Sequence, residues 1–233
     1  MTCSKGTILL FAPHPDDETL GCGGYVAKRI DDGYRVVIVV LTMGEKLFSS
    51  CLKIFVDPSP AEIRNMRRDE TLQATAILGV PSADVLFLTY EDGTLAENTE
   101  AAIRQIIPML HEMKPAEVLC TGPYEEHPDH QATSTIVQRA CAQCIPGTTI
   151  RWYITKLQPG VSVNELPCTV HAIDITQQLG RKTQAVAQFQ AHLAIVSPQQ
   201  TEPMVADFRN YLADHEILLS QYGEDNHVHA VYL

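Results

Sequence analysis

Short apolar runs alternate with longer helical patterns along this chain, and this alternation constrains its fold more than any other feature. Residues 7–12 and 35–43 are continuous runs rich in Val, Ile and Leu, which is typical of strands buried on both faces of a parallel sheet. Residues 20–32, between them, have the pattern of a helix that closes at an Asp-Asp-Gly sequence. The alternation predicts an α/β fold with a mostly parallel, doubly wound sheet, helices on both faces and right-handed crossovers.

The remaining expected elements continue the alternation. Strands are expected at residues 85–89, 118–121, 150–154, 171–175 and 228–233, and helices at residues 61–78, 97–113, 131–143, 178–192 and 203–220. Residues 47–60 lack a period and are expected to form a loop beside the substrate. Because no repeat, low-complexity segment or long linker divides the chain, residues 1–233 are expected to form one domain.

The charge balance restricts the class of partner. The chain of 233 residues carries 17 Lys and Arg against 28 Asp and Glu, a formal net charge of −11. This balance argues against wide contact with nucleic acid, because a phosphate-binding face needs clustered cations. A neutral or cationic small molecule suits it better. No apolar run approaches the ~20 residues that cross a bilayer, and the seven scattered cysteines suit reduced thiols in the cytoplasm.

Two histidine motifs follow two of the expected strands. His-Pro-Asp-Asp-Glu occupies residues 14–18, after the first strand, and His-Pro-Asp-His occupies residues 127–130, after the fourth. Ligands of such sheets bind beyond the carboxyl ends of the strands, so the two motifs can converge there. Imidazole and carboxylate groups suit zinc, and three protein ligands with one open position are the arrangement of a catalytic site. A phosphate loop is disfavoured, because no matching Gly-rich motif is present.

The paired motifs resemble those of the PIG-L/LmbE-like family of zinc N-deacetylases. The resemblance extends to Thr-Leu-Gly-Cys-Gly-Gly at residues 19–24, Leu-Gly-Val at residues 78–80 and Asp-Gly-x-Leu at residues 92–95, and to single residues, namely Arg67, Glu70, Asp174, Lys182 and His192. Residues 228–232 lack the family's usual Ala-Glu-x-Phe. The resemblance implies a Rossmann-like three-layer sandwich and a zinc-dependent hydrolase that removes an N-acetyl group from an amino-sugar conjugate. Members of the family often form homo-oligomers.

The resemblance also implies a role for each motif residue. The expected zinc ligands are His14, Asp17 and His130. Asp16 is the expected general base and His127 its catalytic partner, and Asp129 is expected to orient or tune that histidine. In this scheme zinc lowers the pKa of its water from 15.7 to about 7, and zinc and His127 stabilise the oxyanion. The proton that the departing amine needs comes from Asp16 or from His127.

Several neighbouring residues have two readings. Glu18 is expected to orient a ligand or to cap the following helix, and Arg67 to form a surface ion pair with Glu70 rather than to contact substrate. Asp92 either shapes a turn or contacts a sugar hydroxyl. The remaining expectations are that His192 is either a pocket residue or an ordinary helix-end histidine, that Trp152 and Tyr153 pack in the core rather than stack on a sugar, and that Cys141 and Cys144 are helix residues without a metal.

Two other functions compete with this interpretation. One is a zinc amidase that cleaves a larger acyl conjugate on the same scaffold, and the other is a metal-binding or scaffold protein without catalysis. The presence of both Asp16 and His127 argues against the second, because zinc binding alone requires neither. No motif identifies the sugar, so glucosaminyl-malate, glucosaminyl-inositol, an aminoglycoside intermediate and a cell-envelope sugar all stay open.

Overall fold

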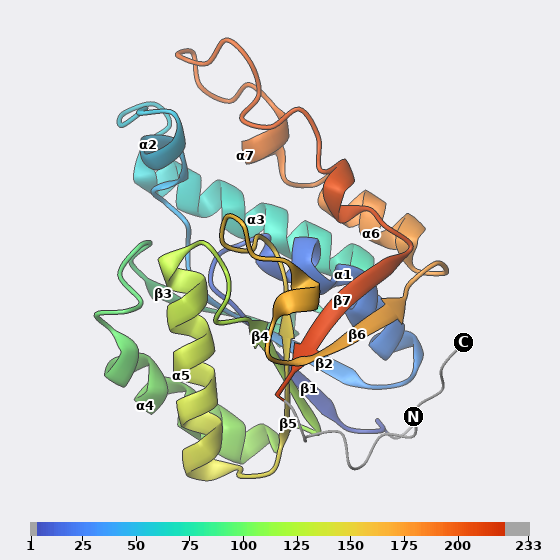
Figure 1. The fold of residues 1–233 in the computed structure, drawn as a ribbon. Coiled ribbons are helices and arrows are strands. Elements are labelled where there is room, and N and C mark those ends of the chain that lie inside the picture. The colour runs from blue at the N-terminus through green and yellow to red at the C-terminus, as the bar shows by residue number, and fades with distance from the viewer. Residues whose placement is uncertain (1–3, 222–233) are drawn as a thin grey trace.

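A computed structural model describes residues 4–221 of the chain (Figure 1). The strand expected at residues 228–233, and the C-terminal residues that depart from the family pattern, lie outside the described residues. Among residues 4–221, no helix is both long enough and apolar enough to cross a membrane.

A seven-stranded sheet forms the centre of the molecule, with the strand order β3-β2-β1-β4-β5-β7-β6. The strands are β1 Thr7–Ala12, β2 Arg35–Thr42, β3 Val85–Tyr90, β4 Glu117–Thr121, β5 Thr149–Tyr153, β6 Thr169–Asp174 and β7 His215–Ser220. Strands β1 to β5 run parallel, whereas β7 runs antiparallel to both β5 and β6. The prediction of a mostly parallel α/β sheet is confirmed.

Helices cover both faces of this sheet (Figure 1). They are α1 Asp17–Asp31, α2 Leu47–Cys51, α3 Pro60–Leu78, α4 Thr99–Met113, α5 Pro128–Cys144, α6 Leu179–Val186 and α7 Gln190–Leu193. Because alternate side chains of a strand point to opposite faces, Ile8 of β1 packs in the core under α1, α3 and α6, whereas Leu9 packs in the core under α4 and α5. Both cores are fully buried, which explains why β1 and β2 have no polar face.

Two helix predictions in the last third of the chain are wrong. Residues 203–220 form no long helix: they hold a short 3-10 helix, Arg209–Tyr211, and then strand β7. The apolar run at residues 217–219 is too short for its period to separate strand from helix, and pairing with β5 and β6 decides for strand. The helix expected at residues 178–192 is two helices, α6 and α7, because the backbone at Phe189 leaves the helical region. The loop expected at residues 47–60 contains the short helix α2.

Both motif helices begin earlier than the apolar pattern predicts. Helix α1 starts at Asp17 rather than residue 20, and α5 starts at Pro128 rather than residue 131. Each motif therefore lies in the connection from a strand into the first turn of a helix. The strands concerned, β1 and β4, are neighbours at the point where the strand order reverses, which is where open α/β sheets bind their ligands.

A buried ion pair supports a break in α1 just below the first motif. The helix loses its regular geometry at Cys22, so backbone groups on both sides lose their helical partners. Lys182 of α6 donates a hydrogen bond of 2.9 Å to the carbonyl of Leu20, and Glu216 of β7 accepts from the amides of residues 24–25 at 2.8 and 2.7 Å. The ammonium and the carboxylate lie 2.6 Å apart. The pair thus caps both halves of the helix and lets its first turn sit apart from the rest.

Candidate active site

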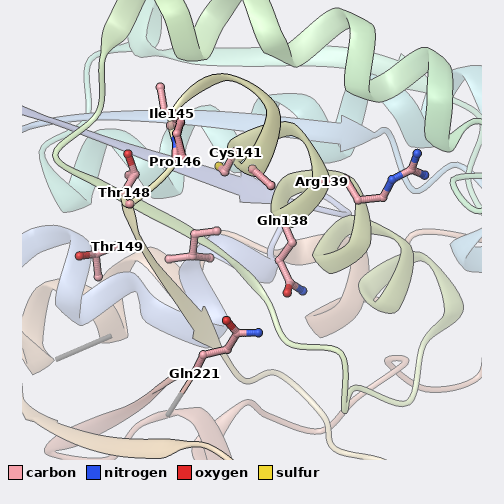
Figure 2. Close-up of a pocket in the computed structure, with 11 residues that line it drawn as sticks. Gln138, Arg139, Cys141, Ile145, Pro146, Thr148, Thr149 and Gln221 are labelled. Carbon is pink, nitrogen blue, oxygen red and sulfur yellow. The ribbon is translucent and has the colours of Figure 1, made fainter. Parts of the chain in front are cut away.

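Two cavities lie toward opposite ends of the strands. One, of about 620 Å³, lies between the end of α5 and the start of β5 and is lined by residues such as Arg139, Cys141 and Thr149 (Figure 2). The other, of about 530 Å³, is lined by residues of both histidine motifs at the carboxyl ends of β1 and β4. The second cavity therefore combines the expected chemistry with the usual place of a ligand.

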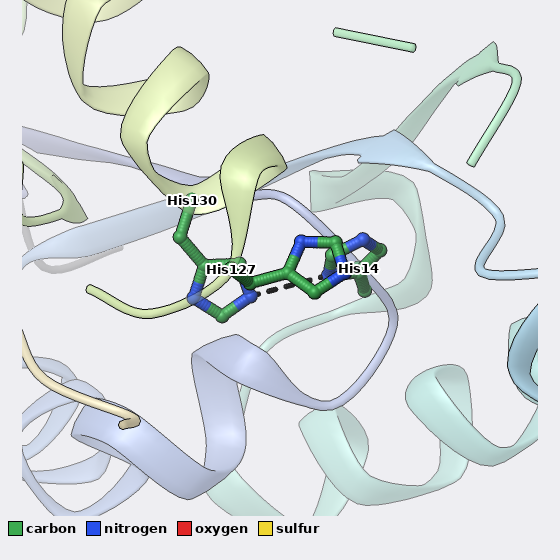
Figure 3. A group of neighbouring side chains, drawn as sticks. All are labelled: His14, His127 and His130. Atoms are coloured by element: carbon green, nitrogen blue, oxygen red, sulfur yellow. Dashed lines mark hydrogen bonds between the residues drawn. The ribbon is translucent and has the colours of Figure 1, made fainter. Parts of the chain in front are cut away.

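Three imidazole rings from the two motifs, His14, His127 and His130, lie together at this end of the sheet (Figure 3), and the last two line the second cavity. The His14 and His127 ring centroids are 4.7 Å apart, and the His130 centroid lies 5.2 Å from each of them. The side chains of His14 and His130 are buried, whereas His127 is exposed. His14 lies more than a hundred positions before the other two histidines in the sequence, and the adjacency of β1 and β4 brings them together.

The three expected metal ligands form a small triangle of donor atoms. His14 Nδ1 lies 3.2 Å from Asp17 Oδ2 and 3.3 Å from His130 Nε2, and the third side, from His130 Nε2 to Asp17 Oδ2, is 3.3 Å. Ligand atoms at about 2.0–2.1 Å from a tetrahedral zinc ion are roughly 3.3–3.4 Å from each other. The donor set and its spacing therefore fit zinc with three protein ligands.

Two carboxylates lie beside the opposite nitrogen of His14. Asp92 Oδ1 and Asp129 Oδ2 each lie 3.3 Å from His14 Nε2. Backbone amides fix both carboxylates: Asp129 accepts from Gly93 and Leu95 at 2.7 and 3.1 Å, and Asp92 accepts from Lys46 at 3.1 Å. Burial opposes the charged form of Asp92, but the His14 hydrogen bond and charge outweigh it and lower its pKa to about 2. Two negative charges beside Nε2 favour a proton on that nitrogen, which leaves Nδ1 free to bind a metal.

A third carboxylate does the same for His130. Glu125 Oε2 lies 3.2 Å from His130 Nδ1, and the carboxylate also accepts from the amides of residues 155–156 at 2.9 and 2.8 Å and from the Thr155 hydroxyl at 2.7 Å. Burial disfavours charge on His130, but the Asp17 carboxylate outweighs burial and raises its pKa to about 9. Because Glu125 holds the Nδ1 proton, Nε2 is the atom available to a metal.

His127 has the opposite arrangement. Its Nδ1 accepts a hydrogen bond of 3.2 Å from the amide of Asp129, so a neutral ring carries its proton on Nε2. Burial, followed by the charges of His14 and His130, lowers the pKa of His127 and favours this neutral form. His127 thus presents an N–H donor to the cavity, whereas His14 and His130 present lone pairs. This difference separates His127 from the two histidines expected to bind the metal, although its ring also lies near enough to belong to a metal cluster.

Asp16 is held in a strained backbone conformation beside the triangle. Its φ of 122° is in the region that side chains rarely adopt. Arg67 binds it on one side, with a hydrogen bond of 2.9 Å to the carboxylate and one of 2.6 Å to the Pro15 carbonyl, and the amide of Asp16 donates to Glu18 at 3.1 Å. Burial raises the pKa of Asp16 to about 6, although the Arg67 charge opposes this rise. The result is a fixed carboxylate with a pKa near neutrality, which suits a general base.

Glu18 and His192, the other polar groups beside Asp16, are buried, and burial favours the uncharged form of each. Burial raises the pKa of Glu18 to about 8, while the carboxyl accepts from the Thr19 hydroxyl at 2.7 Å. His192 Nε2 lies 3.5 Å from Asp16 Oδ2, and burial lowers its pKa to about 3. His192 also lines the cavity together with Leu20 and the aromatic rings Phe208 and Tyr211.

Comparison with known proteins identifies the family. A model of the family described as PIG-L, GlcNAc-PI de-N-acetylase, matches residues 9–141, more than half of the chain and both histidine motifs. The chain belongs to the PIG-L family. Among the relatives of this PIG-L protein, a probable N-acetyl-α-D-glucosaminyl L-malate deacetylase 2 from Bacillus anthracis is 31% identical over 137 residues, which is 58% of this chain and 59% of the relative. The chain spans about half to three fifths of the length of the curated relatives it matches.

Solved structures share the fold of this PIG-L protein. The N,N′-diacetylchitobiose deacetylase from Pyrococcus horikoshii is 25% identical with a TM-score of 0.63, and the match covers 78% of this chain and 68% of that one. The 4-carboxy-2-hydroxymuconate hydratase GalB from Pseudomonas putida is 21% identical with a TM-score of 0.67, and the match covers 79% and 78% of the two chains. The second likeness shows the fold alone, and the different activities of these two proteins show that one fold carries different reactions.

Several expectations from the sequence change on this PIG-L scaffold. The prediction of a surface ion pair between Arg67 and Glu70 is wrong, because Arg67 is buried and pairs with Asp16. The carboxylate of Asp129 lies against His14, and its contact with His127 comes from its backbone amide. Asp92 does more than shape a turn, since it also lies against His14.

Glu125 is the residue that sequence reasoning missed. It lies two positions before the second motif, in a pair of glutamates that resembles an ordinary solvated turn. Its burial beside His130 depends on the loop after β5, about 30 positions along the chain, so the local sequence gives no signal. Trp152 and Tyr153 are buried in the core as predicted, and Cys141 and Cys144 lie on α5 as free thiols.

Proposed function

We propose that this protein is a zinc-dependent hydrolase that removes the N-acetyl group of an N-acetylated amino-sugar conjugate. The activities named for its relatives, an N-acetylglucosaminyl L-malate deacetylase and a diacetylchitobiose deacetylase, support this reaction class. One observation carries the proposal: two histidine lone pairs and one carboxylate form a zinc-sized triangle, and an ionisable aspartate and a donor imidazole lie beside it. Metal binding alone would need neither of these two additional groups.

The proposed zinc ligands are His14, Asp17 and His130. When bound, zinc supplies Lewis acidity, because it lowers the pKa of water to about 7 and polarises a carbonyl oxygen. The carboxylates of Asp92, Asp129 and Glu125 hold the ligand rings in the required tautomers. The neighbours thus orient both histidines, and Asp17 is held by the amide of His14 at 3.0 Å.

Asp16 is the proposed proton carrier. Its carboxylate takes a proton from the attacking water as the new C–O bond forms, and it returns a proton to the amine nitrogen as the C–N bond breaks. A pKa of about 6 suits both halves of this exchange, since the group is ionised at neutral pH and gains a proton readily. Arg67 and Glu18 position this group and do not touch the reacting atoms.

His127 is the proposed hydrogen-bond donor to the acetyl oxygen. Its Nε2 proton faces the cavity because the amide of Asp129 occupies Nδ1. A donor aimed at the developing oxyanion contributes about 2.7–4 kcal/mol in comparable sites. Asp129 would support His127 through its backbone and His14 through its carboxylate. With His127 neutral, Asp16 is the group that protonates the amine.

Asp16→Asn tests this scheme. The variant is expected to keep one zinc ion per chain and to have a kcat for acetate release about 10²–10⁴-fold lower, because the amide keeps the geometry but cannot accept the proton. Asp214→Asn, at an exposed position, is the control. Substantial turnover by the Asp16 variant would overturn its role, and a wild-type protein that binds no zinc would overturn the metal site.

Cleavage of a larger acyl group is the second candidate, because the cavity of about 530 Å³ exceeds the needs of an acetyl group. Measuring the acetate and the longer acids released from matched synthetic amides separates the two candidates.

We propose that the protein works in a reducing compartment, the cytoplasm, since each cysteine among residues 4–221 is a free thiol. One domain and a homo-oligomer stay predictions.

A further inference from the structure

The cavity that holds the proposed zinc site has two unlike walls. One wall consists of Leu20, Phe208 and Tyr211, with rings of Phe208 and Tyr211 in edge contact at 5.9 Å. This wall is apolar apart from the Tyr211 hydroxyl, and it suits the C–H face of a sugar ring. The rest of the lining includes residues 16–17, 125–128 and 155–156, and it contains the charged groups of the cavity.

Carboxylates outnumber cations among the lining residues. The lining carboxylates are those of Asp16, Asp17, Glu125 and Glu126. Lys156 is the one lysine or arginine that lines the cavity in the described part of the chain. Asp92 and Asp129, which contact His14, add two negative charges to this count. Arg67, which contacts Asp16, adds one positive charge. With a divalent cation bound, these groups together keep a negative formal charge.

The cations near the cavity already have carboxylate partners. Lys156 Nζ lies 2.6 Å from Glu126 Oε2 at the rim, where the two side chains are 73% and 41% exposed. Arg209, next in the chain to Phe208, lies 2.6 Å from Asp207. Arg67 is buried against Asp16 and the Pro15 carbonyl and does not line the cavity. A carboxylate on the substrate would have to displace a carboxylate of the protein to find a cation.

We propose that this site selects N-acetylated sugar conjugates whose second moiety, the part attached to the sugar, carries no negative charge. The inference rests on the proposed deacetylase function and specifies its substrate class. It separates this chain from the activity named for its Bacillus anthracis relative, in which the second moiety is L-malate, a dicarboxylate. A neutral polyol or a second amino sugar, as in diacetylchitobiose, fits the lining instead.

The size of the effect follows from charge and desolvation. Two like charges a few ångströms apart near a protein surface repel each other, and water and salt screen part of this repulsion. A carboxylate that enters the cavity without a donor also loses part of its hydration. We therefore expect kcat/KM to differ by about ten-fold or more between a neutral and a dicarboxylate second moiety, with the difference mainly in KM.

The test compares acetate release by the zinc-loaded protein from three probes: N-acetylglucosaminyl-myo-inositol, N,N′-diacetylchitobiose and N-acetylglucosaminyl-L-malate. At least one neutral probe is expected to give a kcat/KM about ten-fold or more above that of the malate probe, and added salt is expected to narrow this ratio. An equal or higher kcat/KM for the malate probe overturns the inference and leaves the deacetylase function standing.

A charge reversal at the rim sharpens the test. Glu126→Lys removes the partner of Lys156 and adds a second cation, so it is expected to raise the kcat/KM for the malate probe several-fold relative to the kcat/KM for the neutral probes. Glu100→Lys is the matched control, because Glu100 also pairs with a cation at 2.6 Å, namely Arg139, but lies on α4 outside the cavity. Equal responses of the two variants would contradict a local effect.

Failure of the proposed function is distinguishable from failure of this inference. If none of the three probes releases acetate, the deacetylase function fails for these conjugates. Calorimetric binding of the same probes to the zinc-loaded protein then tests the charge preference alone. Tighter binding of a neutral probe than of the malate probe supports the inference, and the reverse order, or no binding of a neutral probe, overturns it.

Discussion

Replacing Glu125 by glutamine should weaken zinc binding without removing a ligand. The carboxylate accepts four hydrogen bonds, from two backbone amides, the Thr155 hydroxyl and His130 Nδ1, at 2.7 to 3.2 Å. A glutamine has one acceptor oxygen, so its NH₂ group must face at least one of these donors. The ring of His130 then loses its charged partner and its fixed tautomer.

The expected magnitude follows from that lost contact. Carboxylates that orient metal-binding histidines contribute about 10–100-fold to metal affinity, which corresponds to about 1.4–2.7 kcal/mol. The variant also leaves a buried donor without an acceptor, at a cost of about 1–3 kcal/mol to the free energy of unfolding. Zinc affinity and stability should therefore both fall, and the two effects must be measured separately.

The assay is a competition titration of metal-free protein against a chromophoric zinc chelator, with urea denaturation of the same samples. Glu117→Gln is the matched control, because Glu117 is a buried carboxylate that accepts from Tyr25 and Arg151 but lies at the start of β4, away from the zinc triangle. The control should lose stability and keep its zinc dissociation constant. A Glu125 variant with wild-type zinc affinity would refute the reasoning, as would an equal loss of affinity in the control.

Three further changes test the surroundings of the site. Burial raises the pKa of Glu70 to about 7 from an ordinary value of 4.5, so the folded state binds an extra proton and loses stability as the pH rises through this range. Glu70→Gln should lack this loss, so the free energy of unfolding of the wild type minus that of the variant should fall by roughly 1–2 kcal/mol between pH 4.5 and 8, after allowance for partial solvent screening. A difference that does not change with pH would contradict this prediction. Lys182→Met leaves the buried Glu216 carboxylate without its cation and should lower the free energy of unfolding, measured by urea denaturation, by about 3–5 kcal/mol. The double variant with Glu216→Gln should lose less than the sum of the two single losses. Additive losses would contradict the coupling of the two residues. Gly21→Ala places a methyl group on the Tyr153 ring and should lower the free energy of unfolding by about 1–3 kcal/mol, whereas Gly180→Ala, in open space, should raise it by about 0.4–1 kcal/mol; equal effects would contradict the packing argument.

The sequence predicted the sheet best where burial was complete. Strands β1 and β2 have two buried faces, so their apolar runs have no helical period and their order with α1 follows from the chain. Prediction failed at β7, where the residues next to His215 form a strand because β5 and β6 lie on either side of them. Such pairing joins residues more than 40 positions apart, and no local pattern reports it.

In the candidate site, too, the sequence predicts some residues and gives no signal for others. The motif residues could be found because each motif places several ligand types within four or five positions. Two of the three carboxylates that orient these histidines, Asp92 and Glu125, come from turns whose sequences are ordinary. Arg67 was assigned to the surface because a charged helix residue usually lies there, and its burial follows from the Asp16 carboxylate, which no helix pattern reveals.

The measurement that tests the central proposal most directly is a zinc titration of metal-free protein with acetate release as the readout. With N-acetylglucosaminyl-myo-inositol or N,N′-diacetylchitobiose as substrate, activity should rise linearly with added zinc and level off at one equivalent per chain. The same titration of His130→Ala should give no rise, because a corner of the donor triangle is missing. Acetate release that is independent of zinc, or its absence at one equivalent with every neutral conjugate, would contradict the account.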